Sequence, residues 1–167
     1  MTICETTRLI LRAPVLDDVD FVAAMNADPE VYRFTGGAKT REQTLLRITE
    51  AIDHQQQHGF SLWTVVLKST GAVIGRCGLI RREIAGARDM ELGYAFSREH
   101  WGFGYATEAT RAALDYAVRV RACKRVVAII DPQNRGSLAV AAKLGMSFER
   151  EVEFEGAKLG LYATSRM

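Results

Sequence analysis

The sequence predicts a mixed α/β (α+β) fold, with a mostly antiparallel central sheet of about seven strands and helices on both faces. Three observations predict this fold. Consecutive β-rich runs separated by short turns indicate antiparallel strands between residues 60 and 96. A strand, a helix and a strand between Met90 and Ile130 indicate two parallel neighbours joined by a right-handed crossover. A final hairpin is expected around Glu155–Gly156.

Length and composition are those of a single domain, residues 1–167. The chain is 48% hydrophobic and 25% charged, so it can bury a core. Its net charge of +2 is too small to indicate a nucleic acid or an anionic membrane as a partner. The sequence has no apolar run that could span a bilayer, and its first residues lack the pattern of a signal peptide. We therefore expect a cytoplasmic protein.

The cysteines and histidines predict no metal site. The three cysteines form no CxxC pair, so neither zinc nor a disulfide framework is expected. We interpret Cys77, which lies in an apolar strand, as a thiol of the core. His54 and His58 are four residues apart, which would suit a metal, but no third ligand is visible. A solvated helix face is the better interpretation.

The N-terminal part predicts a strand at residues 8–12 and two helices. Asp17 is the expected cap of the first helix, and a short helical piece is expected at Asp28–Pro29. Thr40–Gln43 has the pattern of a capping box and begins the second helix, which ends at Gly59. The residues expected on the buried sides of these two helices are Phe21, Ala24, Met25, Leu45, Ile48 and Ile52.

The rest of the chain is rich in strands. Strands are predicted at residues 60–67, 72–81, 90–96, 125–130, 146–153 and 158–165. Helices are predicted at about 104–121 and 135–144, and a turn at 86–89. Alternation in the strand at 90–96 predicts one face with Leu92, Tyr94 and Phe96 and an opposite face with Glu91, Gly93 and Ala95.

A glycine-rich turn follows the strand at 90–96. Gly102 and Gly104 bracket Phe103, and a helical period begins at Tyr105. Glycine permits positive φ angles, and the first amides of a helix have no partner inside it, so this turn suits a phosphate or pyrophosphate. The turn lacks the signatures of a P-loop and of a dinucleotide-binding turn. Taken alone, it is equally consistent with a purely structural turn.

The surroundings make this turn specific. The motifs occur in the order Trp101–Ala106, Glu108–Ala109, Asn134 to Ser137 and Lys143–Gly145. This order resembles the GNAT superfamily of N-acetyltransferases, and within it the RimJ/RimL-like ribosomal-protein branch, over nearly the whole chain. The family motif Gln/Arg-x-x-Gly-x-Gly/Ala is represented by Trp101, Gly104 and Ala106. Tryptophan departs from the wider family but is typical of the branch.

The resemblance implies a GNAT fold, in which a bulge splays the parallel central pair of strands at the cofactor cleft. It implies acetyl-CoA as co-substrate, with its pyrophosphate on the turn and its pantetheine along the strand. Asn134 would bond pantetheine, cap a helix, or do both. Arg98 and His100 are either near the phosphates or solvated. The cofactor-binding residues implied are Tyr94, Ala95, Phe96, Trp101, Gly102, Phe103, Gly104, Tyr105, Ala106, Asn134 and Ser137.

The resemblance also implies acetyl transfer to an amine by direct attack in a ternary complex. Such a reaction needs a base for the amine and a proton for the departing thiolate. Glu91 is the candidate base, and the alternative is a surface glutamate. Many family members have a tyrosine that protonates the departing thiolate, at a position between those of Asn134 and Gly145. This chain has no tyrosine there. Ser137 is the candidate acid, or else a capping residue, and an amide near Ala95 would hold the thioester oxygen.

The sequence leaves the acceptor open: a protein N-terminus, a polyamine, an antibiotic or another small amine. Its pocket is expected between residues 31–39, the helix that ends at Gly59 and the hairpin near Glu155. Acidic residues in that region that could attract a cation, or simply be solvated, are Glu30, Glu42 and Glu50. A CoA-binding sensor or regulatory module without turnover and a domain for another phosphate compound are the alternative functions. Homodimers are common in the branch, and no feature of the sequence decides this point.

Overall fold

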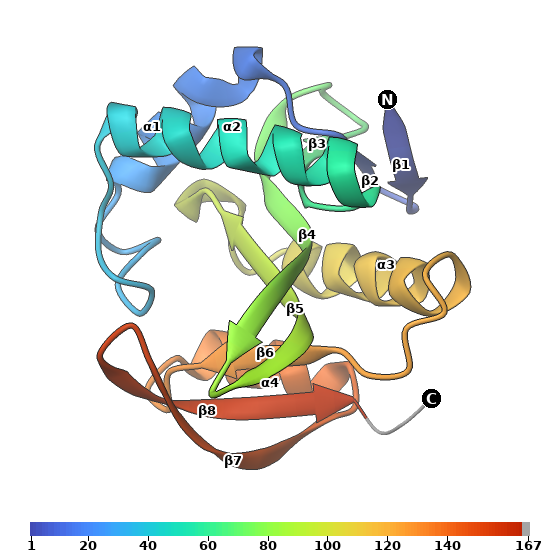
Figure 1. Ribbon diagram of the computed structural model, residues 1–167. Helices are drawn as coiled ribbons and strands as arrows, with labels where there is room; N and C mark the ends of the chain where they lie inside the picture. The colour runs from blue at the N-terminus through green and yellow to red at the C-terminus, as the bar shows by residue number, and fades with distance from the viewer. Residues whose placement is uncertain (165–167) are drawn as a thin grey trace.

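The computed structural model describes residues 1–164, which form one eight-stranded sheet with helices on both faces (Figure 1). The strands are β1 Thr2–Glu5, β2 Leu9–Arg12, β3 Leu62–Leu67, β4 Val73–Ile84, β5 Ala87–Phe96, β6 Val127–Ile130, β7 Met146–Phe154 and β8 Ala157–Thr164. The helices are α1 Val19–Ala27, α2 Arg41–His58, α3 Tyr105–Arg119 and α4 Arg135–Lys143, with short 3-10 helices at Leu16–Asp18 and Arg98–His100. The predicted mixed, mostly antiparallel sheet is confirmed.

One pair of neighbouring strands sets the shape of the sheet. The strand order is β1-β2-β3-β4-β5-β6-β8-β7, and only β5 and β6 are parallel within the described chain. The crossover through α3 produces this pair, as the sequence predicts. Between these two strands only Glu91 and Val127 are paired, and beyond that point the strands diverge. The β6–β8–β7 part therefore lies at an angle to the long β4–β5 hairpin (Figure 1).

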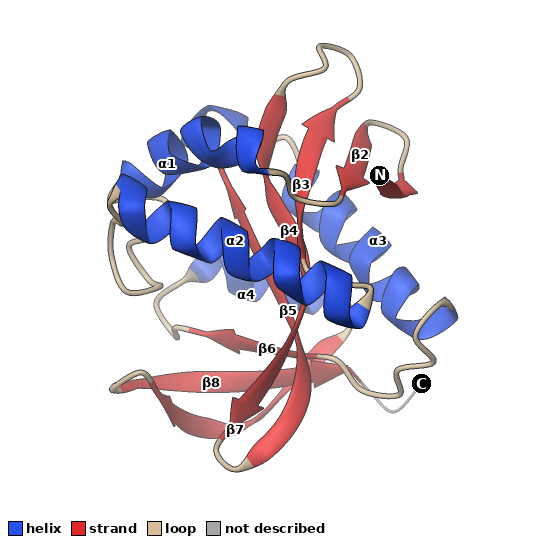
Figure 2. Ribbon diagram, turned by 45° about the horizontal axis from the view of Figure 1, so that its top comes forward, coloured by secondary structure: helices blue, strands red, loops and turns tan. Residues whose placement is uncertain are grey.

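The helices bury the two faces of β5 separately. α1 and α2 lie on one side of the sheet, and α3 and α4 lie on the other (Figure 2). Leu92 and Phe96 are buried with the alanines of α3, whereas Ala95 packs with residues of α1 and α2. The predicted alternation of β5 is thus confirmed. Cys77 is fully buried in the same core as Leu92, as its apolar surroundings predict.

The buried stripe of α2 differs from the predicted one. Leu45 is 41% exposed, and the buried positions of the helix include Thr44 and Gln55. These polar side chains can be buried because each has a partner: Thr44 Oγ1 accepts from the Asn26 amide at 2.9 Å, and Gln55 Oε1 accepts from the Trp63 indole at 2.9 Å. Hydrophobic periodicity cannot predict buried positions that are occupied by polar residues.

Three predictions near α1 are wrong. Asp17 does not cap the helix, because a 3-10 turn precedes α1 and Asp18 instead accepts the Val15 amide at 3.0 Å. Residues 29–36 form turns rather than a helical piece. Ala24 is exposed, whereas its neighbour Met25 is buried. The capping box of α2 is confirmed, with Thr40 and Gln43 exchanging side chain to backbone hydrogen bonds.

The strands differ from prediction mainly in length. β4 and β5 continue through the expected turn at 86–89 and reverse at Ala85–Gly86, because their ladder stays in register to Ile84–Ala87. That ladder has no register shift, so the bulge expected in β5 is absent from it, and the splay comes from the divergence of β6. β1 is an additional edge strand. Ser165, the expected end of the last strand, lies outside the described residues.

Residues 1–164 contain neither a membrane-spanning helix nor a cluster of metal-binding side chains. No helix there is long and apolar enough to cross a membrane. No group of three His, Cys, Asp or Glu side chains there could hold a metal ion. His54 is half-buried rather than solvated, with its Nδ1 2.7 Å from the carbonyl of Phe60.

Candidate active site

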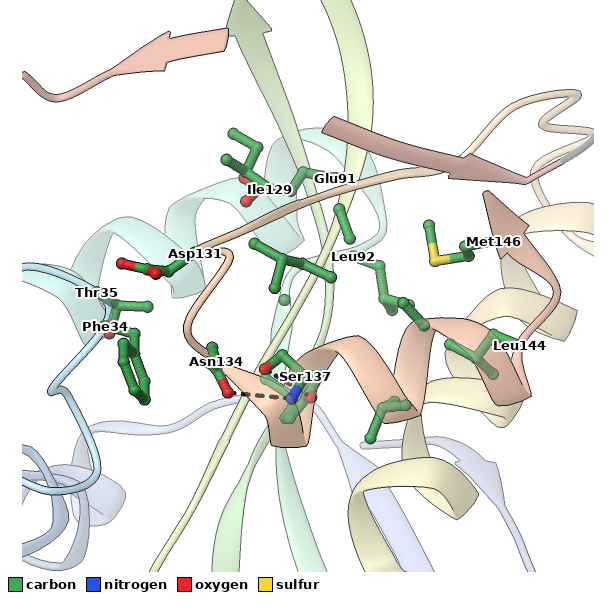
Figure 3. A pocket seen from close by; sticks show the side chains of 16 residues that line it. Phe34, Thr35, Glu91, Leu92, Ile129, Asp131, Asn134, Ser137, Leu144 and Met146 are labelled. Carbon is green, nitrogen blue, oxygen red and sulfur yellow. Dashed lines mark hydrogen bonds between the residues drawn. The ribbon is translucent and has the colours of Figure 1, made fainter. Parts of the chain in front are cut away.

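A cavity of about 120 Å³ opens where β5 and β6 separate. Its walls come from both strands, from α4 and from the segment at Phe34–Thr35 (Figure 3). Several of the predicted site residues line it together: Glu91, Tyr94, Asn134 and Ser137. Because a single residue pair joins β5 to β6, the space beyond that pair is open to a ligand.

The register of β5 decides which of its backbone amides face this gap. The Ser97 amide donates to the carbonyl of Ile74 at 3.1 Å, so it points toward the β4 side. In an antiparallel ladder the direction alternates, so the Ala95 amide also points to β4, whereas the amides of Tyr94 and Phe96 point toward β6. The expected amide near Ala95 that would hold the thioester oxygen is therefore that of Tyr94 or Phe96 rather than that of Ala95 itself, and this role stays a prediction.

The glycine-rich turn presents a set of amides without partners. Gly102 and Gly104 have φ angles of +83° and +82°, and Gly104 is the N-cap of α3. Within the described chain, no hydrogen bond is formed by the amides of residues 102–107. Unpaired amides at a helix N-terminus suit a phosphate group, and the predicted phosphate binding by this turn stays a prediction.

Two long side chains hold this turn in place. The Trp101 indole donates to the carbonyl of Phe96 at 2.8 Å, which ties the turn to the end of β5. Arg8 donates to the carbonyl of Phe103 at 2.9 Å and forms an ion pair with Glu108 at 2.6 Å. Arg8 was not among the predicted site residues, because it is 95 positions from Phe103 and no local pattern connects them.

The aromatic residues of the turn are mostly outside the core. Phe103 is 59% exposed and stacks on Tyr105, with ring centroids 5.7 Å apart. The Arg8 guanidinium lies 4.5 Å from the centre of the Tyr105 ring. Tyr105 is half-buried and, like Ala106, packs against the core. The exposed Phe103 ring beside the amides offers a flat surface for a ring system.

Arg98 and His100 are both engaged elsewhere. Arg98 forms an ion pair with Asp28 at 3.0 Å, which draws it toward the end of α1. His100 Nδ1 lies 2.7 Å from the hydroxyl of Ser97. Neither side chain contacts the amides of the turn, so a role at the phosphates has no support in these contacts.

Glu91 lies beside the single point at which β5 and β6 pair. Its side chain is only 14% exposed and forms an ion pair with Arg82, which is itself 4.0 Å from Glu155. The alternative of a surface glutamate is therefore wrong. Burial raises the pKa of Glu91 above its ordinary value, although Arg82 opposes this shift. A raised pKa beside a cavity is a frequent property of a catalytic base.

Asn134 and Ser137 are placed by the start of α4. Asn134 Oδ1 accepts from the Ser137 amide at 3.1 Å, which confirms the predicted cap (Figure 3). The Ser137 hydroxyl accepts from the Tyr94 phenol at 3.0 Å. This contact was not predicted, because 43 residues separate the pair and β5 and α4 meet only in the folded chain.

The acceptor region predicted from the sequence reaches the cavity only in part. Phe34–Thr35 lines it, but no residue of α2 does, and neither does Glu155. The acidic residues suggested for acceptor binding lie on the exposed surface: Glu30, Glu42 and Glu50. The charged residues that line the cavity are instead Glu91 and Asp131. Asp131 faces the Phe34–Thr35 side (Figure 3).

Comparisons with known proteins agree with this geometry. A sequence profile of the Acetyltransferase (GNAT) domain matches residues 8–147. The protein p20 of Bacillus licheniformis, described as an uncharacterized N-acetyltransferase, is 32% identical over 152 residues, which is 87% of this chain and 82% of p20.

Solved structures share the fold over nearly the whole chain. An acetyltransferase of Agrobacterium tumefaciens C58 matches with a TM-score of 0.85 and 26% identity, over 96% of this chain and 92% of that chain. RimL, a ribosomal L7/L12 α-N-protein acetyltransferase solved with coenzyme A, matches with a TM-score of 0.80 over 99% and 98% of the two chains. Its identity is 18%, so this likeness concerns the fold alone.

Proposed function

Because the chain belongs to the GNAT family of acetyltransferases, we propose that it transfers the acetyl group of acetyl-CoA to a primary amine by direct attack in a ternary complex. The observation that carries the proposal is the joining of two features at β5. A turn with unpartnered amides follows the strand, and a gap that contains Glu91 and Ser137 runs beside it. The turn suits a pyrophosphate, and the gap suits an acyl transfer.

The proposed roles follow from the direction of each group. The amides of residues 102–106 would hold the pyrophosphate, and the amides of Tyr94 and Phe96 would bond pantetheine and the thioester oxygen. Glu91 would take a proton from the attacking amine, directly or through water. Ser137 would give a proton to the departing thiolate. Positioning of amine and thioester would supply much of the remaining rate.

The acceptor is proposed to be a cation in its resting form. Amines are mostly protonated at neutral pH, and the charged lining residues Glu91 and Asp131 are both acidic. A protein N-terminus, a polyamine or another small amine fits this description. The cytoplasmic location, the single domain and a homodimer stay predictions.

One observation favours a second candidate, a CoA-binding module without turnover. Arg82 is paired with Glu91 and competes with the amine for its proton-accepting oxygens. A panel of N-terminal peptides, polyamines, aminoglycosides and amino-acid analogues, read by release of free CoA, separates the two. Binding of acetyl-CoA without release of thiol from any amine would favour the module and contradict the transferase.

The binding site is tested by changing Gly104→Asp. A carboxylate beside the proposed pyrophosphate should weaken acetyl-CoA binding roughly tenfold to 1000-fold, because like charges about 4 Å apart repel by about 1–4 kcal/mol. Gly104→Asn is the matched control, since asparagine has the same shape, tolerates the φ of +82° equally and carries no charge. Affinity is measured by calorimetry. Equal affinities in the two variants would remove the pyrophosphate from this turn.

A further inference from the structure

Tyr94 spans the width of the gap. It projects from β5, lines the cavity, and its phenol reaches the Ser137 hydroxyl on α4 at 3.0 Å. Its ring also packs against the hydrophobic core under α3. A phenylalanine would pack equally well, so packing alone does not explain the hydroxyl group of Tyr94.

The hydrogen bonds around Ser137 have a direction. Tyr94 donates and Ser137 Oγ accepts, in keeping with the greater acidity of a phenol over an aliphatic hydroxyl. The Ser137 amide is used separately by Asn134 at 3.1 Å. In residues 1–164, the Ser137 hydroxyl proton itself has no acceptor. That proton is therefore available to a group in the cavity.

The surroundings keep the phenol protonated. Burial raises the pKa of Tyr94 above its ordinary value, which the bond to Ser137 only partly offsets. The titratable groups near it are Cys77, directly opposite on β4, and the two carboxylates of the cavity, Glu91 and Asp131. None of these is a cation that would stabilise a phenolate. Tyr94 is thus a proton donor over the neutral range.

We propose that Tyr94 is a positioning residue for acetyl transfer, which orients the Ser137 hydroxyl toward the leaving sulfur and renews its proton. The inference rests on the proposed transferase function. The amine nitrogen forms a bond to the acetyl carbon and gives up a proton to Glu91. When the carbon–sulfur bond then breaks, its electron pair stays on sulfur. The Ser137 proton moves to sulfur, and the Tyr94 proton moves to Ser137 Oγ. Water then restores the Tyr94 proton, and Glu91 releases the proton of the amine to water, so that protons balance.

In this arrangement the tyrosine near Ser137 comes from another element of the fold and not from the neighbouring sequence. No tyrosine lies on α4 or in the turn before it, between Asn134 and Gly145. The phenol reaches the same serine from a strand that is 43 residues earlier in the chain. Ser137 and Tyr94 would then act as one unit, and removing both should cost little more than removing Ser137.

The test measures the pKa of the CoA thiol in its complex with the protein, from the ultraviolet absorbance of the thiolate. Desulfo-CoA is the blank. Donors at the sulfur stabilise the thiolate, so its pKa should lie below that of free CoA titrated in the same buffer. In Tyr94→Phe, in Ser137→Ala and in the double variant it should return toward the free value by similar amounts. In Tyr94→Phe, kcat should also fall by about tenfold or more, with unchanged CoA affinity and a changed basic limb of the pH profile.

Tyr116→Phe is the matched control, because its phenol donates to the carbonyl of Gly59 at 2.9 Å and Tyr116 does not line the cavity. It should leave the thiol pKa unchanged. The role of Tyr94 is overturned if Tyr94→Phe keeps the thiol pKa and kcat of the parent. The thiol pKa could depend on Tyr94 in a protein that acetylates no amine. This result would contradict the proposed transferase function but support the contact of Ser137 and Tyr94 with the CoA sulfur. A protein that does not bind CoA would overturn both.

Discussion

Two carboxylates that are largely shielded from solvent, Asp18 in the 3-10 helix before α1 and Glu91 on β5, have opposite surroundings. Asp18 accepts hydrogen bonds from Arg12 at 2.9 and 2.5 Å, from Thr64 at 2.7 Å and from the Val15 amide at 3.0 Å. Glu91 has a single charged partner, Arg82, and borders an open cavity. The side chain of Asp18 is 3% exposed and that of Glu91 is 14% exposed. Both are buried, but only one is fully bonded.

The difference separates a structural role from a functional one. Burial would raise the pKa of Asp18, but the bonds from Arg12, Thr64 and Val15 outweigh it and hold the pKa below its ordinary value. At Glu91 burial dominates, and the pKa is raised. Asp18 therefore stabilises the fold as an anion, whereas the raised pKa of Glu91 is compatible with its proposed role as proton acceptor. The predictions below test this contrast.

The largest effect is expected from Asp18→Asn. Removing the charge leaves the Arg12 guanidinium without its buried partner, which should lower the free energy of unfolding by about 3–5 kcal/mol in denaturant titrations. Asp20→Asn is the matched control: Asp20 is also paired with an arginine, at 2.6 Å, but its side chain is 83% exposed. Its change should stay below about 1 kcal/mol. Equal losses in the two variants would contradict the contrast.

The pH dependence of stability has a defined sign. Because the pKa of Asp18 is lowered by folding, its contribution is present above the unfolded value of about 3.9 and is lost as pH falls through the folded pKa. The Asp18→Asn variant should therefore lose less stability than the parent in this acidic range. Glu91 acts in the opposite direction, since a raised pKa costs stability once the carboxyl ionises.

An intermediate effect is expected from Glu91→Gln. Loss of the base should lower kcat by about 100-fold, with little change in the free energy of unfolding. In the parent, kcat should fall as pH drops through the raised pKa of Glu91, and this limb should vanish in the variant. Glu83→Gln, an exposed carboxylate on β4, is the control and should keep the parent profile. Full activity in Glu91→Gln would assign the base to water or to another group.

The smallest effect is expected from Thr40→Ala. Thr40 accepts the Gln43 amide at 3.2 Å in the capping box of α2, and no residue of α2 lines the cavity. The loss should be about 1 kcal/mol in the free energy of unfolding. Acetyl-CoA affinity should not change. A weaker affinity would show that α2 contributes to the cofactor site, whereas the sequence places this helix only at the acceptor pocket.

The sequence predicted most of the elements and the wall of the site that is local in the chain. The glycine-rich turn, the cap at Asn134 and the capping box at Thr40 are patterns of three to six residues, and each is present. The buried stripe of α2 was predicted less well, because the exchange of apolar for polar residues depends on partners in other elements. Hydrophobic periodicity contains no information about such partners.

The sequence by itself determined most of the order of strands and helices, the parallel pair and the glycine-rich turn, because periodicity and turn chemistry act over a few neighbouring residues. The tertiary structure alone decided which side chains meet. The register of β4 and β5 directs the amides of Tyr94 and Phe96 into the gap toward β6, whereas the Ala95 amide points to β4. The divergence of β6 opens the cavity. Contacts such as Tyr94 to Ser137 join residues 43 positions apart, and only the packing of β5 against α4 specifies them.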